Sequence, residues 1–214
     1  MSTLLITLPQ HDQTMRYIST WAKSVVSEAE QRNIGVFGLH GPRASRKEVE
    51  SMLMKHKPSL VFLNGHGNVG AVTGHDDKPI VEVGENEHVL EKTITYALAC
   101  SSAKILGKES VRCGARAYLG YQKDFIFLYT EQKRTRPDTD HLARLFLDPS
   151  NQIVISLLKN HTVHESLVKG KICFSRNMQK MLTSQTSQED TAALRYLYWN
   201  MSNLVYHGDG TAKI

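Results

Sequence analysis

The feature that most constrains this chain is a repeated alternation between short apolar runs and segments with helical periodicity. Strands that are apolar along their whole length need cover on both faces, so the alternation predicts a mostly parallel sheet between two layers of helices. We therefore expect an α/β fold. The five apolar runs occupy residues 3–9, 34–40, 60–64, 93–100 and 115–121.

Helical patterns fill the gaps between these runs. Ser45 and Glu48 form a capping-box pattern at the start of one helix, which should end ahead of Pro58. Another helix is expected from about residue 102 to residue 113. After the first run, apolar residues at helical spacing predict one continuous helix through Met15, Ile18, Ala22, Val25 and Ala29.

The length of 214 residues suits a single domain, residues 1–214. Its C-terminal helices are expected at about residues 152–181 and 191–205, the second stopping at Gly208. The domain should divide into a sheet core with the chemistry, a basic loop region and a C-terminal helical part, at residues 1–125, 126–150 and 151–214.

Composition narrows the classes of function. The net charge of +5 is spread along the chain without interleaved aromatic residues, so no nucleic-acid partner is expected. No apolar run approaches the ~20 residues of a membrane helix, so a cytoplasmic protein without membrane association is expected. The three cysteines form no C-x-x-C pair, and Cys113 and Cys173 are expected to be inert thiols within helices.

A glycine motif follows the third apolar run. Gly65, Gly67 and Gly70 match the dinucleotide fingerprint G-x-G-x-x-G, which makes nucleotide binding one alternative. That fingerprint needs a helix directly after its glycines, because the helix N-terminus holds the pyrophosphate. Here residues 71–79 read as a loop, which argues against the nucleotide alternative.

The second interpretation of this motif depends on its histidine. His66 directly follows the third run, and Cys100 ends the fourth. The carboxyl ends of neighbouring parallel strands face one crevice, so both side chains can share a cleft suited to nucleophilic catalysis. The Gly67 and Cys100 amides would stabilise an oxyanion. A helix starting near residue 102 would lower the pKa of the thiol.

These residues resemble the caspase-like cysteine peptidases, the group that includes caspases, gingipains, clostripain and the bacterial CHAT proteases. The similarity is closest to the CHAT-type and gingipain-like branch. It covers roughly residues 1–125 and is carried by NGHGN around His66, ALACSSA around Cys100 and the following GARAYLGY. The caspase form Q-A-C-R-G does not occur around Cys100, which argues against an aspartate-directed enzyme.

The resemblance implies a three-layer α/β/α sandwich and a cysteine endopeptidase. It makes Cys100 the nucleophile, His66 the proton-transfer partner, and the Gly67 and Cys100 amides the oxyanion hole. No acid is assigned as a third catalytic member, and no cofactor is expected. The substrate would be a protein or peptide, and CHAT-type relatives imply a regulatory protein partner and a role such as bacterial defence. A catalytically dormant adaptor of the same fold is the other alternative.

The resemblance also suggests how substrate is recognised. Relatives that cut after Arg or Lys place an acid in the substrate pocket, and Asp12 and Asp124 are the candidates. Asp12 is equally suited to be the N-cap of the first helix. The basic loop suggests self-cleavage between Arg134 and Thr135, since Pro137 disfavours a cut after Arg136.

A metal site is not expected from the sequence. Three histidines and two acids lie in one part of the chain, but their spacings fit no zinc pattern. These residues are His66, His75, Asp76, Asp77 and His88.

Overall fold

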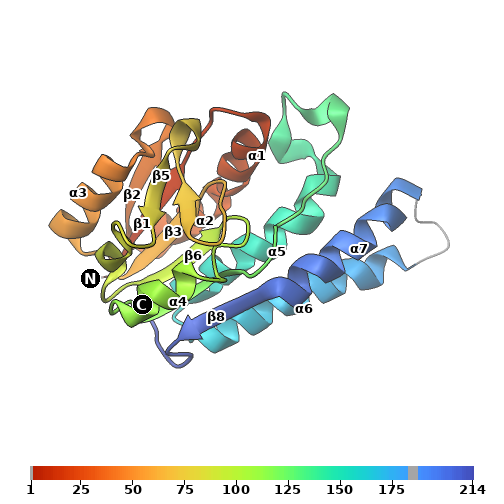
Figure 1. Cartoon of the computed structure of the whole chain (residues 1–214). Helices are drawn as coiled ribbons and strands as arrows, with labels where there is room; N and C mark the ends of the chain where they lie inside the picture. Colours follow the sequence, from red (N-terminus) through yellow and green to blue (C-terminus); the bar gives the residue numbers. More distant parts are fainter. Residues whose placement is uncertain (1, 183–187) are drawn as a thin grey trace.

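A six-stranded sheet forms the centre of the protein in the computed structural model, which describes residues 2–182 and 188–214 (Figure 1). The strand order is β2-β1-β3-β6-β7-β8; the first five strands of this order run parallel and β8 pairs antiparallel with β7. The mostly parallel α/β fold predicted from the sequence is therefore confirmed. The strands are β1 (Thr3–Leu8), β2 (Gly35–His40), β3 (Leu60–Asn64), β6 (Ile94–Leu98), β7 (Ala117–Tyr121) and β8 (Leu204–Gly208).

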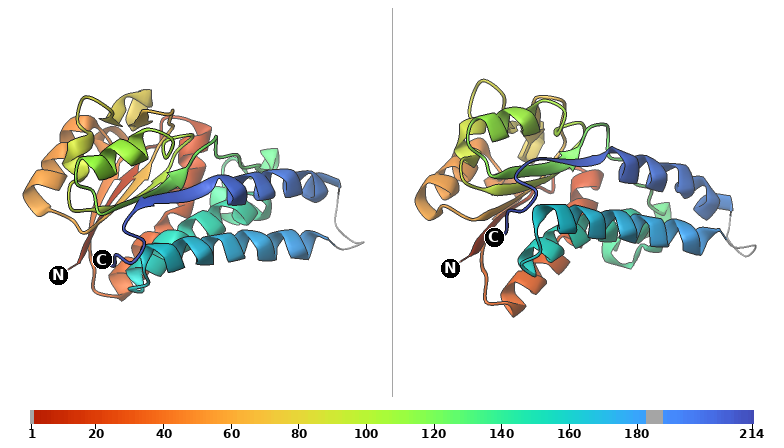
Figure 2. Two further views of the ribbon diagram at one scale, coloured as in Figure 1. Left: turned by 60° about the horizontal axis from the view of Figure 1, so that its bottom comes forward. Right: turned by 90° about the horizontal axis from the view of Figure 1, so that it is seen from below.

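Helices cover both faces of the sheet (Figure 2). Successive strand residues alternate between two apolar clusters: Leu4 and Ile6 pack with α1, α2, α5 and α6, whereas Leu5 packs on the opposite side with α3 and α4. This two-sided burial explains why the strands are apolar along their length. The helices are α1 (Gln13–Trp21), α2 (Lys23–Gln31), α3 (Arg46–His56), α4 (Leu106–Arg112), α5 (His141–Leu158), α6 (Val163–Met181) and α7 (Gln188–Asn203).

A small hairpin that the sequence analysis treated as loop lies between β3 and β6. Its strands, β4 (Ala71–Thr73) and β5 (Pro79–Glu82), pair antiparallel and are joined by a 3-10 turn, His75–Asp77. Val72 and Ile80 of this hairpin are fully buried against the α3 and α4 side of the sheet. Strands of three and four residues are too short to show a recognisable period, so their pairing depends on this packing.

Helix boundaries differ from the prediction at several places. The single helix predicted over residues 152–181 is wrong, because the chain turns after Leu158 and α6 begins anew at Val163 with Thr162 as its N-cap. The helical segment predicted after β1 is present, but as two helices, α1 and α2, that meet at Ala22. Helix α5 begins at His141, inside the predicted loop region 126–150, because the Asp140 side chain accepts hydrogen bonds from the Leu142 and Ala143 amides. The last predicted helix ends early, at Asn203, and the chain continues as strand β8 along the open edge of β7.

The capping box of α3 is only half formed. The Glu48 amide lies 3.4 Å from the Ser45 Oγ, as predicted, but the Glu48 carboxylate pairs with Arg43 at 3.2 Å instead of returning to the Ser45 amide. The helix ends at His56, ahead of Pro58, as the sequence predicted.

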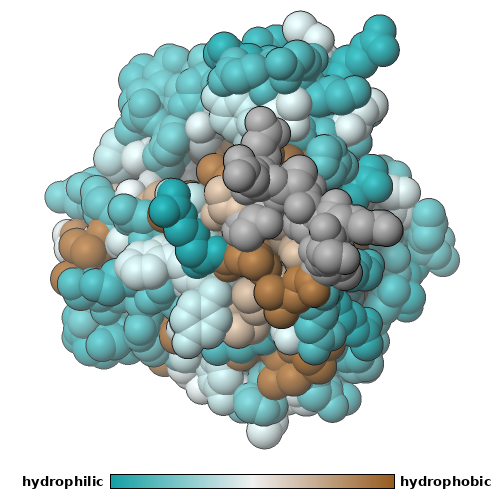
Figure 3. Space-filling model, turned by 90° about the vertical axis from the view of Figure 1, so that its right-hand side faces the viewer, coloured by the Kyte–Doolittle hydropathy of each residue, from teal (hydrophilic) through white to brown (hydrophobic). Residues whose placement is uncertain are grey.

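The C-terminal helices α6 and α7 lie side by side and extend past the sheet (Figures 1 and 2). Apolar side chains, brown in Figure 3, gather on the side of the molecule where these helices end. Leu182 and Tyr198, from this pair of helices, are 72% and 61% exposed. Among the described residues, no helix combines the length and the apolar content that crossing a membrane requires.

Candidate active site

The topological switch point of the sheet lies at its carboxyl edge between β1 and β3, the position that open α/β sheets use as a ligand crevice. Strands β2 and β3 flank β1 in the sheet. The chain leaves β1 toward the face covered by α1 and α2, and it leaves β3 toward the opposite face, where the β4–β5 hairpin packs. Ligands of open α/β sheets bind at such a switch point, outside the carboxyl ends of the strands. His11 and Asp12 follow β1 here, and His66 follows β3.

A buried polar pair, Thr7 and Asn64, joins β1 and β3 directly beneath this crevice. The Thr7 Oγ1 donates to the Asn64 carbonyl at 2.9 Å and accepts from the Asn64 amide at 2.8 Å. The Asn64 Nδ2 donates to the Thr7 carbonyl at 2.8 Å. Both side chains are fully buried, so these bonds fix how far the two strand ends separate.

The register between β3 and β6 brings the predicted catalytic residues together. Asn64 lies opposite Leu98, so His66 and Cys100 are equivalent positions two residues beyond the paired strands. Gly67 lies against the Cys100 backbone, since a Cβ at Gly67 would be 2.7 Å from the Cys100 carbonyl oxygen. The two segments are therefore neighbours. Within the described residues, no hydrogen bond joins the His66 ring to the Cys100 thiol.

The His66 ring is held by Asp12. Its Nε2 lies 2.6 Å from the Asp12 Oδ2, while the Asp12 Oδ1 accepts from the Met15 amide at 2.7 Å. Asp12 thus caps α1, which was one of its two expected roles, and also holds the His66 ring, a contact that the sequence did not indicate. Burial raises the pKa of Asp12, but the bonds from Met15 and His66 outweigh it, so the net pKa lies below its ordinary value.

Cys100 is partly buried, and its thiol donates to the Phe125 carbonyl at 3.8 Å. Burial raises the pKa of Cys100, and the Asp124 carboxylate adds to that effect. The expected helix start near residue 102 is wrong, because residues 101–105 form turns and α4 begins at Leu106. The Ile105 and Leu106 amides donate to the Val69 carbonyl at 3.2 and 2.9 Å, so they anchor the glycine loop.

The two amides proposed for the oxyanion hole belong to neighbouring segments. Gly67 faces the Cys100 carbonyl, as described above, and in the described part of the chain neither the Gly67 amide nor the Cys100 amide donates to a protein acceptor. Peptide N–H groups seldom lack an acceptor unless water or a ligand supplies one. Both donors can therefore serve an oxygen atom of a bound substrate.

The glycines of the fingerprint serve backbone packing. A strand, β4, follows Gly70 where a dinucleotide site needs a helix. A Cβ at Gly65 would collide with the Thr73 carbonyl oxygen, and one at Gly67 with Cys100. A Cβ at Gly70 would meet nothing closer than 3.9 Å. The first two glycines are thus explained by the close approach of the hairpin and of Cys100.

The two acids predicted to bind substrate lie in different surroundings. Asp12 is engaged by His66 and the helix cap. Asp124 is exposed, and its Oδ1 accepts a hydrogen bond from the Ser101 Oγ at 2.9 Å. Since Ser101 directly follows Cys100 in the chain, this bond holds the Asp124 carboxylate near Cys100. Asp124 forms no ion pair with any residue that the structure describes.

Two further residues lie beside the His66–Asp12 pair: His11, which the sequence did not single out, and Asp77, which was considered only as part of an unexpected metal site. The His11 Nε2 lies 3.1 Å from the Asp77 Oδ1. Of the other histidines considered, His75 packs against the His11 ring at 5.3 Å between centroids, and His88 lines a separate hollow beside α3. The one available signal for His11 was its position in the short loop after the first strand.

The proposed self-cleavage bond lies close to the crevice. Arg134 is exposed between the 3-10 turns Glu131–Lys133 and Pro137–Thr139. Its carbonyl accepts from the Gln13 Nε2 at 3.1 Å, and Gln13 directly follows Asp12. The basic loop is therefore attached to the first turn of α1.

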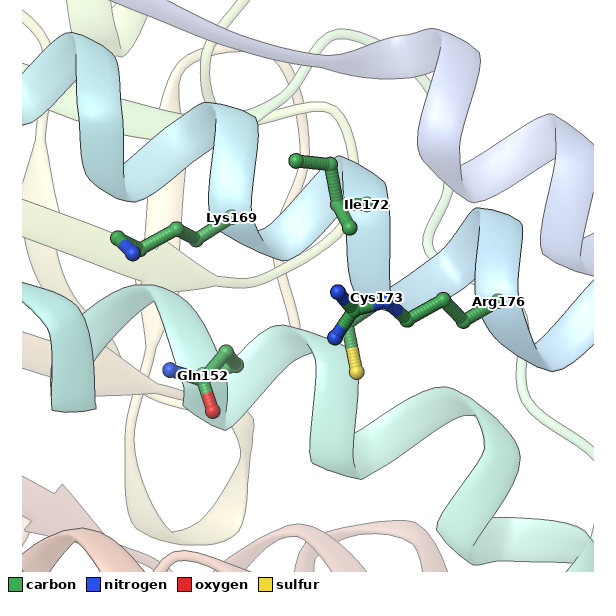
Figure 4. A pocket seen from close by; sticks show the side chains of 5 residues that line it. All are labelled: Gln152, Lys169, Ile172, Cys173 and Arg176. Carbon is green, nitrogen blue, oxygen red and sulfur yellow. The ribbon is translucent and has the colours of Figure 1, made fainter.

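Another hollow, of about 260 Å³, lies between α5 and α6 (Figure 4). Burial raises the pKa of its cysteine, Cys173, which favours the inert role expected for this thiol. None of its lining residues is a predicted site residue. They are Gln152, Lys169, Ile172, Cys173 and Arg176.

The sequence matches no protein-family model, and the search of the curated proteins gave no match. A functional assignment therefore depends on the geometry and chemistry of the site.

Proposed function

We propose that this chain is a cysteine endopeptidase with a caspase-like three-layer sandwich, in which His66 and Cys100 form the catalytic pair. One observation carries the proposal: the β3–β6 register sets His66 and Cys100 side by side at the carboxyl edge, with Gly67 against the Cys100 backbone. Neighbouring segments thus carry the imidazole, the thiol and the two amides that the proposed reaction needs.

In the proposed mechanism, His66 takes the thiol proton and the Cys100 sulfur attacks the scissile carbonyl carbon. The Gly67 and Cys100 amides stabilise the resulting oxyanion. His66 then gives its proton to the departing amine, which leaves a thioester on Cys100. Water hydrolyses the thioester with His66 as general base, which restores the thiol and releases the acid product.

Asp12 is a positioning residue in this mechanism. Since the Asp12 carboxylate accepts a hydrogen bond at Nε2 of His66, the ring proton stays on that nitrogen and the lone pair of Nδ1 remains available to accept the thiol proton. The same contact stabilises the imidazolium that forms during attack.

Asp124 is the favoured determinant of a preference for Arg or Lys before the scissile bond. Its carboxylate is exposed and next to Cys100, whereas that of Asp12 is already paired with His66. A cationic substrate side chain would neutralise Asp124 and thereby remove its contribution to the raised pKa of Cys100, while the larger contribution, burial, would remain.

Regulation by a protein partner fits the resting geometry. A thiol with a raised pKa and no hydrogen bond to His66 suits an enzyme that becomes competent only when substrate or a partner repositions the pair. The apolar surface at the end of α6 and α7 offers a contact for such a partner (Figure 3).

The test is cleavage of a proteome-derived peptide library, read by mass spectrometry, by wild type, Cys100→Ala and the matched control Cys113→Ala. We expect the same cuts with wild type and Cys113→Ala, and none with Cys100→Ala. Cuts that persist in Cys100→Ala would reject the assignment. If no variant cuts anything, constitutive proteolysis is rejected and the dormant adaptor becomes the better hypothesis.

A further inference from the structure

His11, Asp12, His66 and Asp77 converge from three loops at the carboxyl edge of the sheet. Each offers one ligand atom, and these four atoms all lie within 4.8 Å of one another. We propose that the four side chains form a binding site for one divalent transition-metal ion of the Zn²⁺ class, and that metal binding there switches the proposed peptidase off.

The separations suit a tetrahedral ion. The four nitrogen–oxygen distances are 2.6 Å (His66–Asp12), 3.1 Å (His11–Asp77), 3.6 Å (His11–Asp12) and 3.9 Å (His66–Asp77). A tetrahedron with metal–ligand bonds of about 2.0–2.1 Å has edges of about 3.3 Å. These distances lie on both sides of this value, and all four ligand atoms lie within 4.8 Å of one another, so side-chain rotations would bring them to one ion.

The ligand types select the class of metal. Two imidazole nitrogens with two carboxylate oxygens suit Zn²⁺, whereas Ca²⁺ and Mg²⁺ prefer oxygen ligands alone. Within the described residues, Asp12 and Asp77 form ion pairs with His11 and His66 and with no lysine or arginine. The two carboxylate charges are therefore left for a divalent cation to neutralise.

The site is largely preformed. The His11 side chain is only 11% exposed, and the His75 ring packs against its ring. Asp77 belongs to a turn whose His75 amide donates to the Ala44 carbonyl at 2.8 Å, which fixes the turn against the β2–α3 connection. Binding would therefore require little ordering of the chain.

Metal binding would stop the proton transfer on which the proposed function rests. An ion bound at Nε2 of His66 takes the lone pair of that nitrogen and leaves the ring proton on Nδ1. The imidazole then has no nitrogen that can accept the Cys100 proton, and Asp12 no longer holds the ring.

Binding is measured on the full chain carrying Cys100→Ala, so that no thiolate at the site contributes. Co²⁺ titration, followed by ligand-field absorption and by Zn²⁺ competition, should show one tetrahedral ion. His11→Ala should weaken binding at least about tenfold. Asp77→Asn should do the same, and it alters an exposed residue without changing its size. The control Asp76→Asn, a change at an exposed neighbour of Asp77, should bind within about twofold of the parent.

Equal affinity in His11→Ala, Asp77→Asn and the parent would overturn the site, as would a six-coordinate Co²⁺ spectrum. This measurement needs no catalytic activity, so it stands even if the proposed function fails. If the peptidase is active, Zn²⁺ should inhibit wild type, and the ratio of metal-free to Zn²⁺-treated activity should fall at least about tenfold in Asp77→Asn. An unchanged ratio would overturn the switch.

Discussion

The Nε2 of His66 lies 2.6 Å from the Oδ2 of Asp12, although 54 positions separate the two residues. The contact exists because β1 and β3 are neighbours at the switch point of the sheet, so the loops that follow them meet. One carboxylate therefore caps α1 and orients the imidazole of the proposed catalytic pair.

Replacing Asp12 separates its two roles. Asn is as good an N-cap as Asp, so Asp12→Asn should preserve stability while it lowers kcat by about 10²-fold, because the His66 ring loses its carboxylate partner. Asp12→Ala should in addition lower the free energy of unfolding by about 1 kcal/mol. Steady-state kinetics with chemical denaturation checks both. A rise in KM for basic peptides with unchanged kcat would instead assign Asp12 to substrate binding.

Gly67 and Gly70 should respond differently to a methyl group. Gly67→Ala places a Cβ 2.7 Å from the Cys100 carbonyl oxygen, so we expect a loss of about 1–3 kcal/mol in the free energy of unfolding and of most peptidase activity. Gly70→Ala meets nothing within 3.9 Å and should change stability by less than about 0.5 kcal/mol. Loss of nucleotide binding in Gly70→Ala would support the fingerprint interpretation instead.

Alkylation of Cys100 should show its raised pKa. Because the thiolate is the reacting form, the rate of iodoacetamide modification should keep rising with pH beyond the ordinary thiol range. Asp124→Asn removes a nearby negative charge, which lowers the pKa and should speed alkylation at neutral pH about twofold. The exposed Asp138→Asn serves as the control. An alkylation rate whose midpoint in pH lies below the ordinary thiol pKa would contradict the statement that burial raises the pKa of Cys100.

Self-cleavage should occur between Arg134 and Thr135. The Arg134 side chain is exposed and its carbonyl is bonded to Gln13, next to the crevice. Intact-mass spectrometry of purified wild type should show two fragments, whereas Cys100→Ala and Arg134→Ala should remain whole. A wild type that is fully active at its intact mass would exclude this step from activation.

The Thr7–Asn64 pair should be important for stability. Thr7→Val keeps the shape but leaves the buried Asn64 amide without an acceptor, so the free energy of unfolding should fall by about 1–3 kcal/mol. Thr3→Val, in the same strand, should change it by less than about 0.5 kcal/mol. Equal effects in urea denaturation would show that the pair does not hold the strand ends together.

The central strands could be predicted from the sequence because a strand that is buried on both faces is a continuous run of apolar residues. Strand β3 has the predicted bounds, Leu60–Asn64, and α3 stops before Pro58, since apolar runs and backbone restrictions act within a few residues. The positions of His66 and Cys100 at strand ends followed from the same runs.

The tertiary structure decided what depends on contacts distant in sequence. Strands β4, β5 and β8 are short and form because partner strands and a buried surface are available. The strand order, which the apolar runs do not specify, brings His11, Asp12 and Asp77 to His66. The sequence by itself determined which segments are buried; only the folded chain decided which of their ends meet, because that choice depends on how whole layers pack.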